Sequence, residues 1–181
     1  MRVTALLAGL IVCSSLLFAD DRTVDFDQQV DFSKIKTFNI RRGEVTSQKP
    51  ELNNPLFAKK LGEAIRAELL AKGLKETADR PDVYVDYSIA GLDYSLVVNR
   101  PASRGPDGPN GRPGVVIQGA GPQPVRFTEG TLTVEMNIRE PGTLIWRGQY
   151  RDEERNGSKL AQKLPVDAKK LLSDYPPKKK K

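Results

Sequence analysis

Two segments of alternating apolar and polar residues, joined by a short turn, constrain the fold of this chain more than any other feature. They are residues 131–138 and 143–150. Their inward-facing residues are Leu132, Val134, Met136 and Ile138 in the first, and Leu144, Trp146 and Tyr150 in the second. Between them, Pro141 fixes φ and Gly142 accepts a positive φ, as a tight turn requires. The pattern predicts an antiparallel hairpin with one buried face, which other elements must cover.

The clearest helix begins after Asn54. Asparagine is a good N-cap, and Pro55 at the first helical position loses no needed donor. An apolar stripe follows at a spacing of four residues: Phe57, Leu61, Ile65 and Leu69. Lys72 and Gly73 end the helix, because a cation suits the negative end of the dipole and glycine can turn left-handed. The stripe predicts an amphipathic helix packed on a sheet.

Three further elements are predicted from periodicity. Residues 23–40 alternate toward their end, with Phe38 and Ile40 on one face, and predict a strand followed by a polar linker over residues 41–53. Residues 82–89 predict a half-buried strand whose pattern can continue to Val98. A last helix is predicted over residues 165–174, ended by two prolines. Its apolar stripe is Leu164, Ala168, Leu171 and Tyr175.

The resulting order, β-α-β-β-β-α, predicts the fold class α+β: a two-layer sandwich whose mainly antiparallel sheet carries two helices on one face. The other face of the sheet would be polar, with Tyr84, Asp86, Ser88, Thr133, Glu135, Arg147 and Gln149. We expect one domain over residues 20–177. Residues 101–124 hold six prolines and six glycines and predict a hairpin loop.

The N-terminus has the pattern of an export signal. Arg2 precedes an uncharged run over residues 3–17, and Ala19 precedes the acidic Asp20. This predicts a signal peptide over residues 1–19 and a periplasmic location. An uncleaved membrane anchor is the alternative, but the run is shorter than the ~20 residues of a spanning helix.

Cys13 raises a second alternative, an outer-membrane lipoprotein carrying acyl chains. A lipoprotein signal places a small residue before the cysteine, whereas Val12 stands here and the apolar run continues beyond Cys13. We therefore expect Cys13 to leave with the signal peptide, so that membrane association would follow only if Cys13 were lipidated. The mature chain would then form no disulfide.

Composition narrows the chemistry. The chain has no histidine, and Cys13 is its only cysteine. A Ser–His–acid triad, a Cys–His dyad and a zinc site with His or Cys ligands are therefore excluded. We expect a protein that is not an enzyme, with no catalytic, cofactor-binding or metal-binding residues. Asp25, Asp27 and Asp31 form an acidic cluster but lack the glycine-bearing loop and bidentate Glu of a calcium site, so turn and strand-edge carboxylates are the favoured interpretation.

Four other features have simpler structural explanations. Glu135 and Arg147 are expected to form a solvated cross-strand pair. Trp146 alternates with Leu144 and is expected in the core, rather than as a ligand platform. Residues 156–158 match a glycosylation acceptor pattern that means little in a bacterial periplasm. Residues 178–181 are four lysines, which supply four of the six net positive charges, and a solvated tail is the default interpretation.

Several motifs occur in a familiar order. They are Asp25-Phe26-Asp27, Asp31-Phe32 with Lys36-Thr37-Phe38, Asn54-Pro55-Leu56 through Lys72-Gly73, Pro81-Asp82, Glu129-Gly130-Thr131-Leu132, Leu144-Ile145-Trp146-Arg147-Gly148 and Tyr175-Pro176-Pro177. In these the chain resembles the bacterial domain of unknown function 4136 family over nearly all of its mature length. The resemblance implies an exported envelope protein, in a family where many members carry a lipoprotein cysteine and no activity or ligand is agreed.

Three functions remain open at this level. The favoured one is a noncatalytic envelope module that binds a protein partner or envelope component through its polar sheet face or its Pro/Gly-rich loop. The second is a hydrolase of an envelope glycan that uses carboxylates alone, which requires two of them about 5–10 Å apart, and no such pair is expected on convergent elements. The third is a lipid-surface protein that uses the lysine tail. Export argues against nucleic acid as a partner, and the oligomeric state is undetermined.

Overall fold

The computed structural model describes residues 21–41, 43–100, 121–138 and 142–177. The predicted signal peptide and lysine tail, the turn residues 139–141 and most of the predicted loop lie outside these residues. Seven strands and two α-helices are present in the described chain, with one short 3-10 helix, η1 (Phe32–Lys34). The strands are β1 (Arg22–Phe26), β2 (Thr37–Ile40), β3 (Glu44–Thr46), β4 (Lys75–Glu76), β5 (Val83–Arg100), β6 (Gly121–Ile138) and β7 (Leu144–Glu154). The helices are α1 (Pro55–Ala71) and α2 (Gly157–Leu172).

The strands form one sheet in the order β1-β7-β6-β5-β2-β4, and β3 pairs with β5 beyond the end of β2. The pairs β1–β7, β7–β6 and β6–β5 are antiparallel, whereas β2 and β3 run parallel to β5 and β4 runs parallel to β2. The α+β class with a mainly antiparallel sheet and two helices is therefore confirmed. The predicted order was incomplete, because it lacked β1, β3 and β4.

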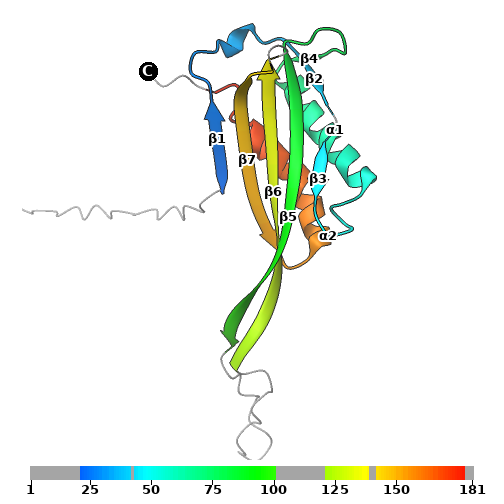
Figure 1. Cartoon of the computed structure of the whole chain (residues 1–181), viewed down its shortest axis with the longest axis vertical. Coiled ribbons are helices and arrows are strands. Elements are labelled where there is room, and N and C mark those ends of the chain that lie inside the picture. Colours follow the sequence, from blue (N-terminus) through cyan, green and yellow to red (C-terminus); the bar gives the residue numbers. More distant parts are fainter. Residues whose placement is uncertain (1–20, 42, 101–120, 139–141, 178–181) are drawn as a thin grey trace, which may run out of the picture.

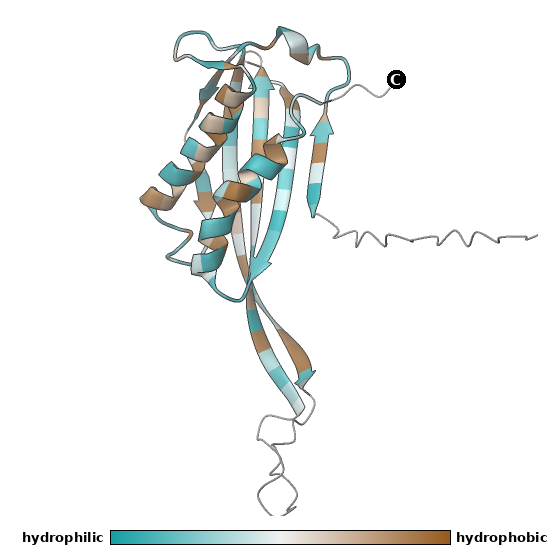
Figure 2. Cartoon of the chain, turned by 180° about the vertical axis from the view of Figure 1, so that it is seen from behind, coloured by the Kyte–Doolittle hydropathy of each residue, from teal (hydrophilic) through white to brown (hydrophobic). Residues whose placement is uncertain are grey.

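Both helices lie over the same face of the sheet (Figures 1 and 2). The helix predicted after Asn54 is confirmed: the Asn54 side chain accepts a hydrogen bond from the Phe57 N–H at 2.8 Å, and Gly73 has a φ of +86°. The stripe of α1 is buried against the inward residues of the sheet, as are the predicted apolar residues of α2. This shared core holds the two layers together through burial of apolar area.

The single strand predicted over residues 23–40 is two strands in the structure. Residues 23–40 form two strands, and β1 lies at the β7 edge of the sheet while β2 lies beside β5. Asp31 interrupts the pattern, because its side chain accepts the Ser33 N–H at 3.2 Å and caps η1. The predicted linker over residues 41–53 contains β3.

Helix α2 begins eight residues before the predicted start at Pro165. Asn156 is its N-cap and accepts a hydrogen bond from the Ser158 N–H at 2.8 Å, so the glycosylation-like triplet is a helix start. Pro165 lies inside the helix. Proline usually marks a first turn, but here tertiary packing of Leu160 and Leu164, both fully buried, extends the helix through it.

The hairpin of β6 and β7 is confirmed, with two corrections on its inward face. Ile138, expected inward, is 36% exposed at the end of β6, and the second correction is a bulge in β7. A register irregularity lies between Met136 and Asn137, which pair with Trp146 and Leu144. Ile145 is the extra residue and is buried, while Leu144 is 42% exposed. A bulge of this kind shifts the alternation by one residue, which a strict period of two cannot predict.

Strands β5 and β6 continue far beyond their neighbours as a twisted two-stranded ribbon (Figure 1). We call this region the arm. It comprises residues 91–100 of β5 and 121–130 of β6, and β7 still pairs with residues 128–130 at its base. The pairing runs without a shift from Val83–Ile138 to Arg100–Gly121. The predicted loop over residues 101–124 is therefore corrected at its end, since residues 121–124 belong to β6 despite Pro122 and Pro124.

Candidate functional site

The body of the sheet is apolar toward the helices and polar on its other side. In β5, the residues Val83, Val85, Tyr87 and Ile89 are buried, whereas the alternating residues Tyr84, Asp86 and Ser88 reach solvent. In β6, Leu132, Val134 and Met136 are buried in the same way. This polar open face is the one that the sequence predicts.

At Gly91 and Gly130, which pair directly, the distribution of polar and apolar residues between the two sides of the sheet changes. Because the register does not shift, each strand keeps its alternation of sides into the arm. On the helix side the arm carries the polar residues Asp93, Ser95, Asn99, Arg126 and Thr128, together with Val97, Pro122 and Pro124. On the open side it is mainly apolar, although Gln123 and Glu129 also lie there.

We call the apolar residues on the open side of the arm the arm stripe. They are Leu92, Tyr94, Leu96, Val98, Val125 and Phe127. Tyr94 pairs directly with Phe127 and Leu96 with Val125, whereas Leu92 and Val98 pair with Glu129 and Gln123. Leu92 is 63% exposed and Leu96 is 50% exposed. Figure 2 shows apolar colour along this part of the ribbon, where neither helix covers it. A contiguous exposed apolar surface of this kind is typical of an interaction site.

The base of the arm stripe is partly covered by the end of β7. The rings of Tyr94 and Phe127 stack at 5.5 Å between centroids, and the Arg155 guanidinium lies 5.5 Å from the Phe127 ring centroid. The Tyr94 hydroxyl donates a hydrogen bond to Glu153, and this bond raises the pKa of Tyr94 to about 12. Because β6 pairs with β7 no further than Thr128, the residues nearer the tip of the arm have no such cover from β7.

A row of charged residues crosses the open face of the sheet body. Arg41 Nε donates to Asp86 Oδ1 at 2.7 Å, and Arg147 Nε donates to Glu135 Oε1 at 2.7 Å. Asp86 and Glu135 are direct partners on β5 and β6. The arginines on each side offset the repulsion expected between two carboxylates at opposed positions. The predicted cross-strand pair of Glu135 and Arg147 is thus confirmed.

This row corrects one expectation about carboxylates. The sequence predicts no acidic pair on convergent elements, yet the β5–β6 register places Asp86 opposite Glu135. A hollow of about 240 Å³ lies beside them, lined also by Glu44, Ser88 and Thr133. Each carboxylate is held by an arginine on an open face of the sheet.

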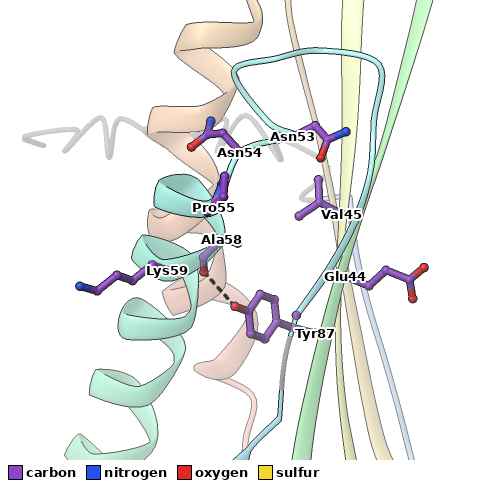
Figure 3. Close-up of a pocket in the computed structure, with 9 residues that line it drawn as sticks. Glu44, Val45, Asn53, Asn54, Pro55, Ala58, Lys59 and Tyr87 are labelled. Atoms are coloured by element: carbon purple, nitrogen blue, oxygen red, sulfur yellow. Dashed lines mark hydrogen bonds between the residues drawn. The ribbon is translucent and has the colours of Figure 1, made fainter.

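A second hollow, of about 610 Å³, lies between β3 and the start of α1 (Figure 3). Tyr87 forms its floor and donates a hydrogen bond to the Ala58 carbonyl at 2.8 Å. The charged side chains at its rim, Glu44 and Lys59, point away from it on opposite sides. Val45, Asn53, Asn54 and Pro55 also line the hollow.

A buried carboxylate in α2 escaped sequence reasoning. Asp167 is 2% exposed and accepts a hydrogen bond from Lys170 Nζ at 3.1 Å. Its Oδ2 atom finds no partner among the described residues. Burial raises the pKa of Asp167 against the opposing effect of Lys170. Lys170 also donates to the Tyr150 hydroxyl at 3.1 Å, so this half-exposed lysine links the buried Asp167 of α2 to β7.

The remaining candidates have structural roles. Asp27 accepts the Gln29 N–H at 2.8 Å and Asp31 caps η1, so both are turn carboxylates. Within the described ranges, no group of three or more His, Cys, Asp or Glu residues is placed to hold a metal ion. Trp146 is fully buried, as predicted. None of the helices in the described part of the chain has the length and apolar character needed to cross a membrane.

Solved structures of other bacterial proteins are similar to this chain in fold. A PDZ domain protein from Parabacteroides distasonis ATCC 8503 is 14% identical with a TM-score of 0.53, over 89% of this chain and 36% of that one. This chain thus spans about a third of that protein's length. A DUF4136 family protein from Bacteroides thetaiotaomicron VPI-5482 is 17% identical, with a TM-score of 0.49, over 86% and 95% of the two chains. A PelC dodecamer from Paraburkholderia phytofirmans is 12% identical, with a TM-score of 0.44, over 84% and 96%.

At these identities the likeness is one of fold alone. No curated protein matches the sequence. The profile of a family described as a domain of unknown function, DUF4136, matches residues 22–177, which include every strand and helix described above. The chain therefore belongs to the DUF4136 family.

Proposed function

We propose that this chain is an exported, noncatalytic cell-envelope protein that binds a protein partner through the arm stripe. The observation that carries the proposal is the change at Gly91 and Gly130, beyond which apolar residues lie on the open side of the sheet. A strand that kept the pattern of the body would turn polar residues to the open side of the arm. Instead, six apolar residues lie there, and in the described chain only the end of β7, at Tyr94 and Phe127, covers part of them. Uncovered apolar area is unfavourable in water, so its presence supports a partner that buries it.

The compartment rests on the N-terminal sequence and on the family. A positive residue, an apolar run and Ala19 support export to the periplasm. An outer-membrane lipoprotein anchored at Cys13 is the alternative for the same compartment. The absence of histidine and the position of Cys13 within the export signal support a noncatalytic role.

Site-specific photo-crosslinking in the cells that make the protein tests the binding role. A photoreactive residue replaces Leu96, in the arm stripe, or Leu56, an apolar residue of α1 that is 79% exposed and lies outside the arm. The expected result is a discrete crosslinked protein from position 96 and none from position 56. Equal capture at both positions, or none at position 96, would count against the arm stripe as the binding surface.

Intact mass and fractionation test the compartment in parallel. A soluble periplasmic chain that begins at Asp20 is expected. A chain that retains Cys13 with acyl groups in the membrane fraction would establish the lipoprotein alternative, and a cytoplasmic chain would overturn export.

A further inference from the structure

We propose that the free edge of β5 in the arm pairs with the same edge of a second copy of this chain. The contact is antiparallel, is centred on Val97, and joins two arms into one four-stranded sheet. This inference concerns the edge of the arm and not the arm stripe, so it goes beyond the proposed function.

The direction of the backbone groups on β5 follows from one hydrogen bond. The Arg41 N–H donates to the Val85 carbonyl at 3.0 Å, so Val85 directs its backbone groups toward the β2 side of β5. In a strand these groups alternate between the two edges residue by residue. Since the β5–β6 register is continuous to the end of the arm, Ser95, Val97 and Asn99 direct their N–H and C=O groups to the same side.

Among the described residues, that side of β5 is open in the arm. β3 pairs with β5 only as far as Ala90, and Lys49 contacts Asp93 at 3.1 Å. No other strand of the described chain pairs with β5 beyond these points. An open row of backbone donors and acceptors is a template for another strand.

The other edge of the arm is protected. Pro122 and Pro124 of β6 are partnered with Asn99 and Val97 of β5, which direct their own backbone groups outward. In such pairs the residues on both strands point their backbone groups away from each other, so the two prolines occupy the outer edge of β6. Proline has no N–H and blocks strand addition. Residues 94–99 of β5 contain neither proline nor charge.

The unprotected edge suits a second copy for three reasons. An antiparallel pair of identical strands is related by a two-fold axis, the commonest symmetry of oligomers. With Val97 at that axis, Ser95 lies opposite Asn99 of the other copy, and Leu96 lies opposite Val98. No like charges meet, and the two arm stripes become one continuous apolar face on the same side of the sheet.

The size of the contact predicts a weak dimer. Seven paired residues extend over roughly 24 Å, and a sheet about 10 Å thick then buries about 240 Å² per copy at this edge. A stable interface buries about 800 Å² per partner. We therefore expect association that depends on concentration, strengthened where the chain is gathered on one surface.

Disulfide trapping tests the register. In the full chain with Cys13→Ser, the variants Val97→Cys, Ser95→Cys and Asn99→Cys each carry a single cysteine. Two copies of residue 97 would be about 5.5 Å apart between Cα atoms, within disulfide range. Two copies of residue 95, or of residue 99, would be roughly 14 Å apart along the strands. Under mild oxidation we expect about tenfold more covalent dimer from Val97→Cys than from either control.

Two further variants keep the test decisive. Val97→Lys places two lysines at the axis, and sedimentation of this chain should show loss of the weak dimer seen with Val97 intact. Leu96→Cys tests packing of arm stripe on arm stripe. Preferential trapping by Leu96→Cys, equal trapping by all the cysteine variants, or a monomer at every concentration would each overturn the edge pairing. Photo-crosslinking of another protein at position 96 would still support the proposed function in those cases.

Discussion

A matched pair of leucine-to-alanine substitutions tests whether the arm stripe is a surface or a part of the folding core. Leu132 of β6 is fully buried under the helices, and Leu96 of the arm is 50% exposed. Each substitution removes three carbon atoms, and a buried methylene contributes about 0.8 kcal/mol. Leu132→Ala should therefore lower the free energy of unfolding by about 2–5 kcal/mol once the cavity is included.

Leu96→Ala should cost much less. Half of the side chain is already in water, so loss of transfer free energy is about 1 kcal/mol at most, and no enclosed cavity forms. Opening of the arm independently of the body would reduce the effect further. Urea unfolding followed by the fluorescence of Trp146, the single tryptophan and a fully buried one, measures both variants. If Leu96→Ala proved as destabilising as Leu132→Ala, the arm stripe would belong to the core and the binding argument would fail.

Three other substitutions test the accounts of packing and charge. Hydrogen bonds from the Lys36 N–H and from Thr37 lower the pKa of Asp82. The ionised carboxylate therefore stabilises the fold above the pKa of Asp82 in the unfolded chain, and this contribution is lost as the pH falls through the pKa of Asp82 in the folded chain. Asp82→Asn should reduce the loss of stability seen in urea midpoints between about pH 5 and pH 2, and an unchanged acid profile would refute this. Gly43→Ala should cost about 1–3 kcal/mol, because its Cβ would overlap the Tyr87 ring, and a cycle with Tyr87→Leu should remove most of that cost. Burial raises the pKa of Asp167, so its protonated carboxyl favours folding below the unfolded pKa, and that advantage is lost as the pH rises through the folded pKa. Asp167→Asn should therefore flatten this part of the plot of unfolding free energy against pH. A steeper plot in the variant would contradict the argument.

Local patterns in the sequence determined the elements whose signals lie within a few residues. Asn54 caps α1, and the stripe ending at Leu69 is buried, because an N-cap and a spacing of four residues act within one helix. The strand predicted over residues 82–89 and the hairpin around Gly142 formed for the same reason, since a period of two sorts side chains between two faces. The polar face of the sheet body followed from that same period.

Other features depended on contacts between distant parts of the chain. Packing against the sheet carried α2 through Pro165, and a bulge exchanged Leu144 for Ile145 on the inward face. The neighbours Asp86 and Glu135 met through a register that neither strand specifies alone.

The arm shows most clearly how the two contributions divide. The alternation of apolar residues beyond Gly91 is present in the sequence and predicts a strand there. Alternation by itself does not say which face of a strand is covered, because that depends on where the helices lie. The helices cover one side of the sheet and do not extend along the arm, so tertiary structure alone left the apolar side of the arm exposed to solvent.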